Sequence, residues 1–141
     1  MGESDLTGGC LCGAVRYRVA ALRGGATLCH CRTCQRAGGG PFMAFAPVAH
    51  ADFALTQGAL ALYRSSDIAE RGFCGHCGSP LTYRGFASDH VSIAVGSLDA
   101  PEAAAPTHQL AAEQALSWLR PALDAPNQTL ADWLKSDPDS V

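Results

Sequence analysis

Short apolar segments separated by turn residues occupy the first two thirds of the chain. Residues 14–19 read AVRYRV, in which apolar and charged side chains partly alternate, as in a strand with one buried face. Glycine, proline and aspartate residues divide this region into segments of similar length. We therefore predict an antiparallel sheet, with strands at residues 14–19, 42–46, 53–56, 60–64, 81–84 and 91–95.

The last third of the chain has a different pattern. Residues 109–119 carry apolar side chains at helical spacing, and alanine is frequent between positions 100 and 115. Thr129 and Asp132 have the spacing of a capping box around an apolar group that includes Leu130 and Trp133. The predicted fold class is therefore mainly β, a small antiparallel-sheet protein with one or two short C-terminal helices.

Length and composition favour one globular domain. The chain has 141 residues, of which 48% are hydrophobic, enough to bury a core without disulfides. No apolar run approaches the ~18 residues that a membrane helix needs. Residues 1–7 lack the basic start and apolar stretch of a secretory signal. We therefore expect a cytoplasmic protein with no membrane partner, whose modest hydrophobicity and few charges permit a homodimer.

All seven cysteines lie in close groups rather than singly. The groups are a C-x-C pair, a C-x-C-x-x-C triplet and a C-x-x-C pair: Cys10 and Cys12; Cys29, Cys31 and Cys34; Cys74 and Cys77. Cystines do not persist in a reducing compartment, and close pairs bring two thiolates to one ion with little extra ordering of the chain. The spacing therefore predicts zinc sites rather than disulfides.

Four cysteines from two distant segments could complete one tetrahedral zinc site. Cys10 and Cys12 would supply two ligands, and Cys74 and Cys77 the other two. A glycine follows the second cysteine of each pair and suits a tight turn whose backbone N–H groups point at sulfur. A redox-active C-x-x-C is the alternative for the second pair, but no thioredoxin-like βαβ pattern surrounds it.

Cys29, Cys31 and Cys34 remain for a second zinc ion, and no eighth cysteine exists to close that site. Catalytic zinc sites typically have three protein ligands and leave the fourth position to water or substrate. These cysteines are therefore the candidate catalytic residues, as ligands, and a thiol is the matching soft substrate. The alternative is closure by a histidine, for which the candidates are His30, His50, His76, His90 and His108.

Cationic and glycine-rich residues adjoin the triplet. Arg32 and Arg36, together with GGGPF at 38–42, could donate hydrogen bonds to the carboxylates of a small acidic thiol. Solvated arginines in an ordinary loop would explain the same residues. No general base is evident beyond His30 and His50.

The charge balance argues against a nucleic-acid partner. The formal net charge is −3, and Lys135 is the only lysine. Zinc proteins that bind nucleic acid need lysine and arginine to neutralise phosphates. We therefore expect small-molecule partners and no nucleic acid.

Three motifs resemble, in order, the glutathione-dependent formaldehyde-activating enzymes: GGCLCG at 8–13, CHCRTC at 29–34 and RGFCGHCGS at 71–79. The resemblance continues through YRSS at 63–66 and VGSLD at 95–99 to His108. It implies a tent-like zinc fold, shared in outline with methionine sulfoxide reductase B. We expect this domain over residues 7–125, with an N-terminal tail at 1–6 and a C-terminal helix or tail at 126–141.

The resemblance also implies a reaction and a set of ligands. The activity would be that of a carbon–sulfur lyase, an S-(hydroxymethyl)glutathione synthase-like enzyme that joins glutathione to formaldehyde. Its cofactor would be two zinc ions per chain, with the thiol and a small aldehyde as partners. The implied ligands are Cys10, Cys12, Cys74 and Cys77 for the structural ion and Cys29, Cys31 and Cys34 for the second, which agrees with the ligand count.

Two other functions are compatible with the sequence. Resemblance to centromere protein V allows a non-enzymatic zinc module for protein or chromatin binding, which would need a basic extension that the 141 residues lack. Alternatively, the triplet could lose zinc and oxidise, as in a thiol redox or metal sensor.

Overall fold

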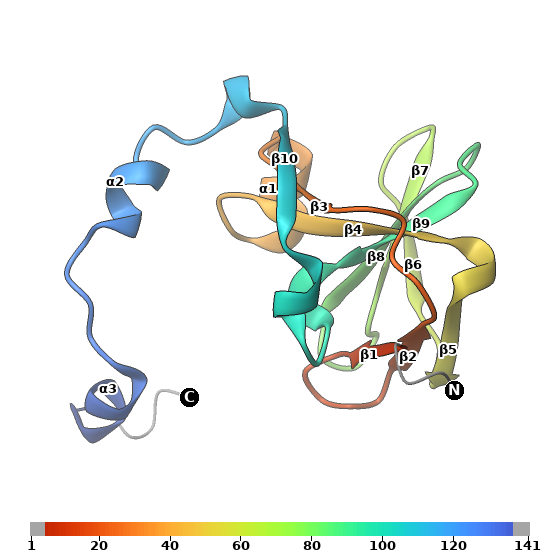
Figure 1. Ribbon diagram of the computed structural model, residues 1–141, viewed down its shortest axis with the longest axis horizontal. Helices are drawn as coiled ribbons and strands as arrows, with labels where there is room; N and C mark the ends of the chain where they lie inside the picture. The colour runs from red at the N-terminus through yellow and green to blue at the C-terminus, as the bar shows by residue number, and fades with distance from the viewer. Residues whose placement is uncertain (1–4, 137–141) are drawn as a thin grey trace.

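Two sheets make up the body of the computed structural model, which describes residues 5–136 (Figure 1). The smaller sheet has the strand order β1-β2-β5, and the larger has the order β10-β3-β4-β9-β8-β7-β6. The strands are β1 (Leu6–Gly9), β2 (Arg16–Val19), β3 (Ala26–Cys29), β4 (Met43–Ala49), β5 (Phe53–Gln57), β6 (Ala61–Arg64), β7 (Ala69–Phe73), β8 (Pro80–Gly85), β9 (His90–Ala94) and β10 (Pro106–Leu110). The helices are α1 (Arg32–Gly38), α2 (Leu119–Leu123) and α3 (Leu130–Ser136). The mainly β fold class with short C-terminal helices is confirmed.

The core joins the two sheets. In β2, Tyr17 and Val19 are buried whereas the alternating arginines are half-exposed, which is the pattern of a strand with one face inside. These side chains share one apolar cluster with Val48, Leu81 and Ile93 of the larger sheet. The face of each strand that carries the apolar side chains is therefore the face that packs into the core.

The six predicted strands correspond to β2, β4, β5, β6, β8 and β9. All strand pairs are antiparallel except β10 with β3, which is parallel. The sequence pattern did not reveal β1, β3, β7 and β10. Every residue of β10 is exposed, so this edge strand is held by its pairing with β3 and leaves no apolar period in the sequence.

The predicted helix at 109–119 is wrong. The segment instead contains the end of β10, a short 3₁₀ turn and the first residue of α2. Ala111 has a left-handed φ of 55°, which no α-helix allows. Hydrogen bonds to the rest of the fold explain the change: the His30 N–H donates to the Leu110 carbonyl at 3.0 Å, and the Gln35 amide donates to the Gln114 carbonyl at 3.2 Å. Tertiary contacts thus override the helix propensity of an alanine-rich stretch.

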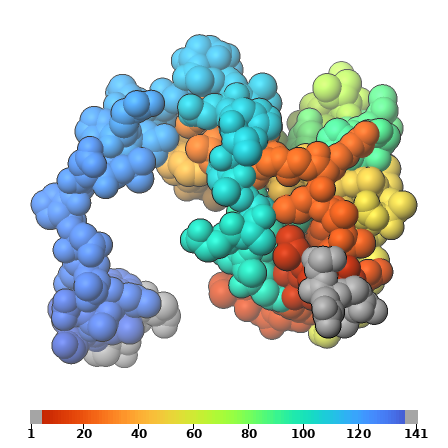
Figure 2. Space-filling model, in the orientation of Figure 1, coloured from red at the N-terminus to blue at the C-terminus, as the bar shows by residue number. Residues whose placement is uncertain are grey.

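The end of the C-terminal segment lies away from the sheets. Figures 1 and 2 show α3 standing apart from the body, whereas residues of α2 line a cavity together with Leu28 of β3. At α3 the Asp132 N–H donates to Thr129 Oγ1 at 3.1 Å, so the predicted cap forms. Positions 1–4 of the expected N-terminal tail and 137–141 of the expected C-terminal tail lie outside the described residues. Within 5–136, no helix is long and apolar enough to cross a membrane.

Candidate functional site

The cysteines of the first and last motifs meet in one cluster. One pair lies in the turn after β1, and the other lies in the turn between β7 and β8. The sulfur atoms of Cys10, Cys12, Cys74 and Cys77 all lie within 4.8 Å of one another. The Sγ atoms of Cys12 and Cys74 are 3.8 Å apart although 62 residues separate them in sequence. The cluster therefore fastens the smaller sheet to the larger one.

Hydrogen-bond donors point at these sulfur atoms. The Val15 N–H donates to Cys10 Sγ at 3.2 Å, and this bond lowers the pKa of the Cys10 thiol. The Ser79 hydroxyl lies 3.2 Å from Cys77 Sγ, and together with the backbone of Ser79 it lowers the pKa of Cys77 to about 5. Both thiolates are thus stabilised before any metal binds.

This cluster fits a structural zinc ion. Its donor set is four sulfur atoms, which is a common tetrahedral set for zinc. Gly13 and Gly78 have φ values of 81° and 79°, in the left-handed region that glycine adopts without strain. These turns allow the chain to fold back around the sulfur atoms, and the N–H and hydroxyl donors that contact the sulfur atoms offset the thiolate charge.

Cys29, Cys31 and Cys34 form a second cluster, also within 4.8 Å of one another. Cys29 ends β3, and Cys31 is the N-cap of α1, where its sulfur accepts the Cys34 N–H at 3.3 Å. Gly39 ends the helix in a left-handed conformation with φ of 72°. The turn from β3 into this short helix therefore brings three sulfur atoms together within six residues.

The second cluster differs from the first in its burial and its number of donors. Burial raises the pKa of Cys29 to about 12 in the absence of a metal. Within the described residues, three sulfur atoms and no histidine nitrogen make up this group. Three soft donors fit zinc with one coordination position left over.

A cavity of about 560 Å³ opens beside the second cluster. Strands β3, β4, β7, β8, β9 and β10, helix α1 and the loop after β6 contribute its walls. Its lining consists of Thr27, Cys29, Cys31, Thr33, Cys34, Phe45, Pro47, Ser65, Ser66, Arg71, Tyr83, His90, Ser92, His108 and Leu110. The open side of the three-cysteine cluster therefore faces a space large enough for a small ligand.

Arg71 is the cationic residue that sequence reasoning missed. It lies on β7, and its Nη2 is 3.6 Å from Cys34 Sγ. The guanidinium carbon lies 5.0 Å from the ring centroid of Tyr83, a cation–π distance. The only sequence signal was the position of Arg71 at the start of the RGFCGHCGS motif.

Arg32 and Arg36 are exposed and are absent from the lining of this cavity. Both lie on α1, whose buried residues are Cys34 and Gln35. The Arg32 guanidinium hydrogen-bonds Gln35 Oε1. Their proposed contacts with substrate carboxylates would therefore need a ligand that extends out of the cavity.

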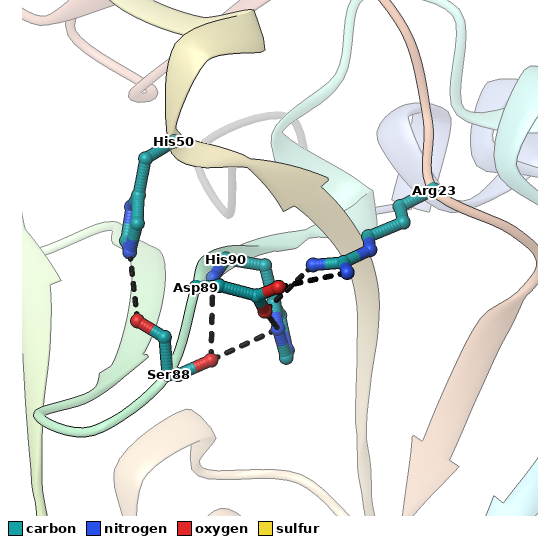
Figure 3. Close-up of polar contacts among 5 residues, drawn as sticks. All are labelled: Arg23, His50, Ser88, Asp89 and His90. Atoms are coloured by element: carbon teal, nitrogen blue, oxygen red, sulfur yellow. Dashed lines mark hydrogen bonds and ion pairs between the residues drawn. The ribbon is translucent and has the colours of Figure 1, made fainter.

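The histidines fall into two groups. His30 is buried, its Nε2 lies 2.8 Å from Gln109 Oε1, and it is absent from the lining of the cavity beside the cysteines. His50 contacts the Ser88 carbonyl outside the cavity (Figure 3). His90 and His108, which the sequence did not single out as bases, line the cavity.

His90 belongs to a polar group at the start of β9 (Figure 3). Its Nδ1 lies 2.9 Å from Ser88 Oγ and 3.2 Å from Asp89 Oδ1. Arg23 donates to both oxygens of Asp89, at 2.7 and 2.8 Å. Arg23 first, and then His90, hold the pKa of Asp89 well below its usual range. This arrangement fixes the orientation of the His90 ring.

The fold and the two cysteine clusters define a small, mainly β protein with two candidate zinc sites. Comparison with known families agrees, because the model of the glutathione-dependent formaldehyde-activating enzymes matches residues 5–114. The chain belongs to this family. The match ends before α2 and α3, so the C-terminal segment lies outside it.

Two similar proteins support the assignment. An uncharacterised lyase of Schizosaccharomyces pombe is 34% identical over 79 residues, which are 56% of this chain and 57% of the relative. The matched region thus spans little more than half of that relative's length. A crystal structure of a Rhodobacter sphaeroides protein has a TM-score of 0.60 and 26% identity, and the match covers 73% of this chain and 98% of the other.

Proposed function

We propose that this protein is a zinc-dependent enzyme of the carbon–sulfur lyase type, which binds glutathione or a similar thiol and adds it to formaldehyde or another small aldehyde. The observation that carries the proposal is the three-cysteine cluster with its open side toward a cavity of about 560 Å³. Family membership and the lyase relative support the reaction class. Because free thiolates need a reducing compartment, we place the reaction in the cytoplasm.

The two clusters would have different roles. Cys10, Cys12, Cys74 and Cys77 would hold a structural ion, and the other three cysteines would hold the ion at the reaction site. When bound there, zinc would favour the thiolate form of a thiol substrate and keep it beside the aldehyde. The cysteines act as ligands and not as nucleophiles.

The reaction itself is an addition. The sulfur of the substrate thiolate attacks the carbonyl carbon, a C–S bond forms, and the π electron pair of the C=O bond moves to oxygen. The thiol proton leaves to solvent, and the new alkoxide takes a proton from solvent, so the adduct is S-hydroxymethylglutathione. The cavity holds the two reactants together and limits their motion, which lowers the entropic part of the barrier.

Residues of the cavity wall are suited to this task. Arg71 places N–H donors next to the sulfur cluster, and His90 and His108 supply further polar atoms. Both nitrogens of His108 already have partners, Thr27 Oγ1 at 2.6 Å and Thr107 Oγ1 at 3.1 Å. The oriented His90 is therefore the better candidate to contact polar groups of a bound thiol.

A non-enzymatic zinc module is the second candidate function. A protein or chromatin module needs its zinc only to hold the fold, which the four-cysteine cluster alone could do. The three-cysteine cluster beside a cavity gives such a module no advantage. A redox sensor would use the same three thiols, and the cavity beside them gives such a sensor no evident role.

Zinc stoichiometry combined with glutathione titration tests the proposal. Wild-type protein should contain two zinc ions per chain and bind glutathione. Cys31→Ser should retain one zinc ion and its fold but lose glutathione binding. Cys77→Ser, the same chemical change in the other cluster, should destabilise the fold while the folded fraction still binds glutathione.

Equal glutathione binding by wild type and Cys31→Ser would show that the three-cysteine cluster is not the thiol site. A single, tightly held zinc ion in the wild-type protein would favour the non-enzymatic module.

A further inference from the structure

Among residues 5–136, Arg71 is a cation without a carboxylate partner. Its side chain is half-buried, and its Nε atom is inaccessible and has no hydrogen-bond partner within residues 5–136. No carboxylate in that range forms an ion pair with it. Removing a guanidinium from water is costly unless a nearby negative charge compensates.

Arginines elsewhere in the fold are paired with carboxylates. Arg16 pairs with Asp99, Arg23 pairs with Asp89, and Arg84 pairs with Glu70 at 2.8 Å. The side chains of Arg16, Arg23 and Arg84 are 34%, 48% and 43% exposed, whereas the Nε atom of Arg71 is shielded from solvent. The missing carboxylate at Arg71 therefore requires another source of negative charge.

The guanidinium is directed at the three-cysteine cluster. Tyr83, the cross-strand neighbour of Arg71 on β8, covers one face of it at 5.0 Å. Its Nη1 lies 4.0 Å from Met43 Sδ, and its Nη2 lies 3.6 Å from Cys34 Sγ. These contacts come from three different elements, so they fix the side chain with its N–H groups next to the cysteine sulfur atoms.

Among the described residues, no carboxylate lines the surrounding cavity. Aspartate and glutamate are absent from its fifteen lining residues, and Arg71 is the only arginine or lysine among them. Three thiolates around one Zn²⁺ carry a net charge of −1, which would repel an incoming anion. A single fixed positive charge beside the cluster cancels that repulsion.

Resting on the proposed function, we propose that Arg71 is the anion-binding residue of the open site and receives the sulfur of the thiol substrate as a thiolate. Its N–H groups compensate the charge of the cluster and of the entering sulfur. The thiol proton leaves to solvent. Arg71 thus selects for the anionic sulfur atom that small thiols share, and not for the carboxylates that distinguish glutathione.

The competing role for Arg71 is a contact with a glutathione carboxylate. The two roles predict different responses to two probes, glutathione and 2-mercaptoethanol, because the second has a thiol but no carboxylate. Thiol binding is measured by calorimetric titration of the zinc-loaded protein without aldehyde, so that catalysis does not enter the result. Zinc content and thermal unfolding report whether each variant is intact.

Arg71→Met should weaken the binding of both thiols by the same factor, about 10- to 100-fold, as expected for loss of a charge-assisted hydrogen bond. Arg71→Lys, which keeps the charge and some of the packing, should recover part of this loss. Lys135→Met is the control for net charge, because its side chain is 80% exposed and lies on α3; it should bind both thiols as wild type does.

Weakened binding of glutathione alone would overturn the inference in favour of a carboxylate contact. Unchanged binding of both thiols in an intact Arg71→Met protein would overturn it outright, although the proposed function would stand. Failure of the wild-type protein to bind either thiol would overturn the proposed function and the inference together.

Discussion

Ser79 provides a sharp test of the structural zinc site. Its hydroxyl lies 3.2 Å from Cys77 Sγ and accepts the Leu11 N–H at 3.0 Å. A serine hydroxyl has one proton to donate, so the bond to sulfur uses it and the bond from Leu11 uses a lone pair. Ser79 therefore connects the two cysteine turns that hold the four-cysteine cluster.

Ser79→Ala removes both bonds without changing a ligand. The pKa of Cys77, now lowered to about 5, should rise, and protons should then compete better with zinc for that sulfur. Loss of a hydrogen-bond partner of a metal ligand usually costs about 10- to 100-fold in metal affinity, and the same loss is expected at this site. Ser79→Thr keeps the hydroxyl and should retain most of the affinity.

Competition with a chromophoric zinc chelator at neutral pH measures the effect. Ser92→Ala is the matched control, because Ser92 lines the cavity beside the three-cysteine cluster. This substitution should leave the zinc affinity of the four-cysteine cluster unchanged. Zinc affinity of Ser79→Ala equal to that of wild type would refute the role of the hydroxyl. Equal losses of zinc affinity in Ser79→Ala and Ser79→Thr would show that the effect comes from packing and not from the hydroxyl.

Three further outcomes follow from the geometry. A strong chelator should remove zinc quickly from the three-cysteine cluster, which lies beside a cavity, and slowly from the four-cysteine cluster, which has one more sulfur ligand. Release of both zinc ions in a single phase would contradict this difference between the sites. Ile93→Ala, at a fully buried position of β9, should cost about 2–5 kcal/mol in urea unfolding, whereas Ile68→Ala, at a position 72% exposed, should change stability little. Arg23→Met should be less stable than wild type at neutral pH. Because the pKa of Asp89 is lowered in the folded state, this difference should persist above about pH 4 and shrink as the pH falls through that pKa; a difference independent of pH would contradict the ion pair.

The sequence was most informative where the apolar period and the cysteine spacing were strong. Residues 91–95 form β9 almost as predicted because Val91 and Ile93 alternate with polar neighbours toward the core. The two clusters likewise contain the cysteines that ligand counting had grouped. Cysteines separated by one or two residues must lie close together in space, so their grouping is visible in the sequence.

The cavity wall could not be predicted because it depends on long-range pairing. Arg71 reaches Cys34 across 37 residues of sequence, and β10 brings His108 beside Thr27 across 81. Arg32 and Arg36 are close to the cysteines in sequence, yet the helix turns them to solvent. Proximity along the chain is therefore a poor guide to which charged residues surround the site.

Under the proposed function, the three-cysteine zinc site accepts the sulfur of a thiol substrate. Zinc X-ray absorption spectroscopy measures this directly, because it counts sulfur neighbours. With seven cysteines and two zinc ions per chain, the average should be about 3.5 sulfur atoms per zinc without substrate. Saturating glutathione should raise this average to about 4, and an average that stays at about 3.5 would contradict the claim.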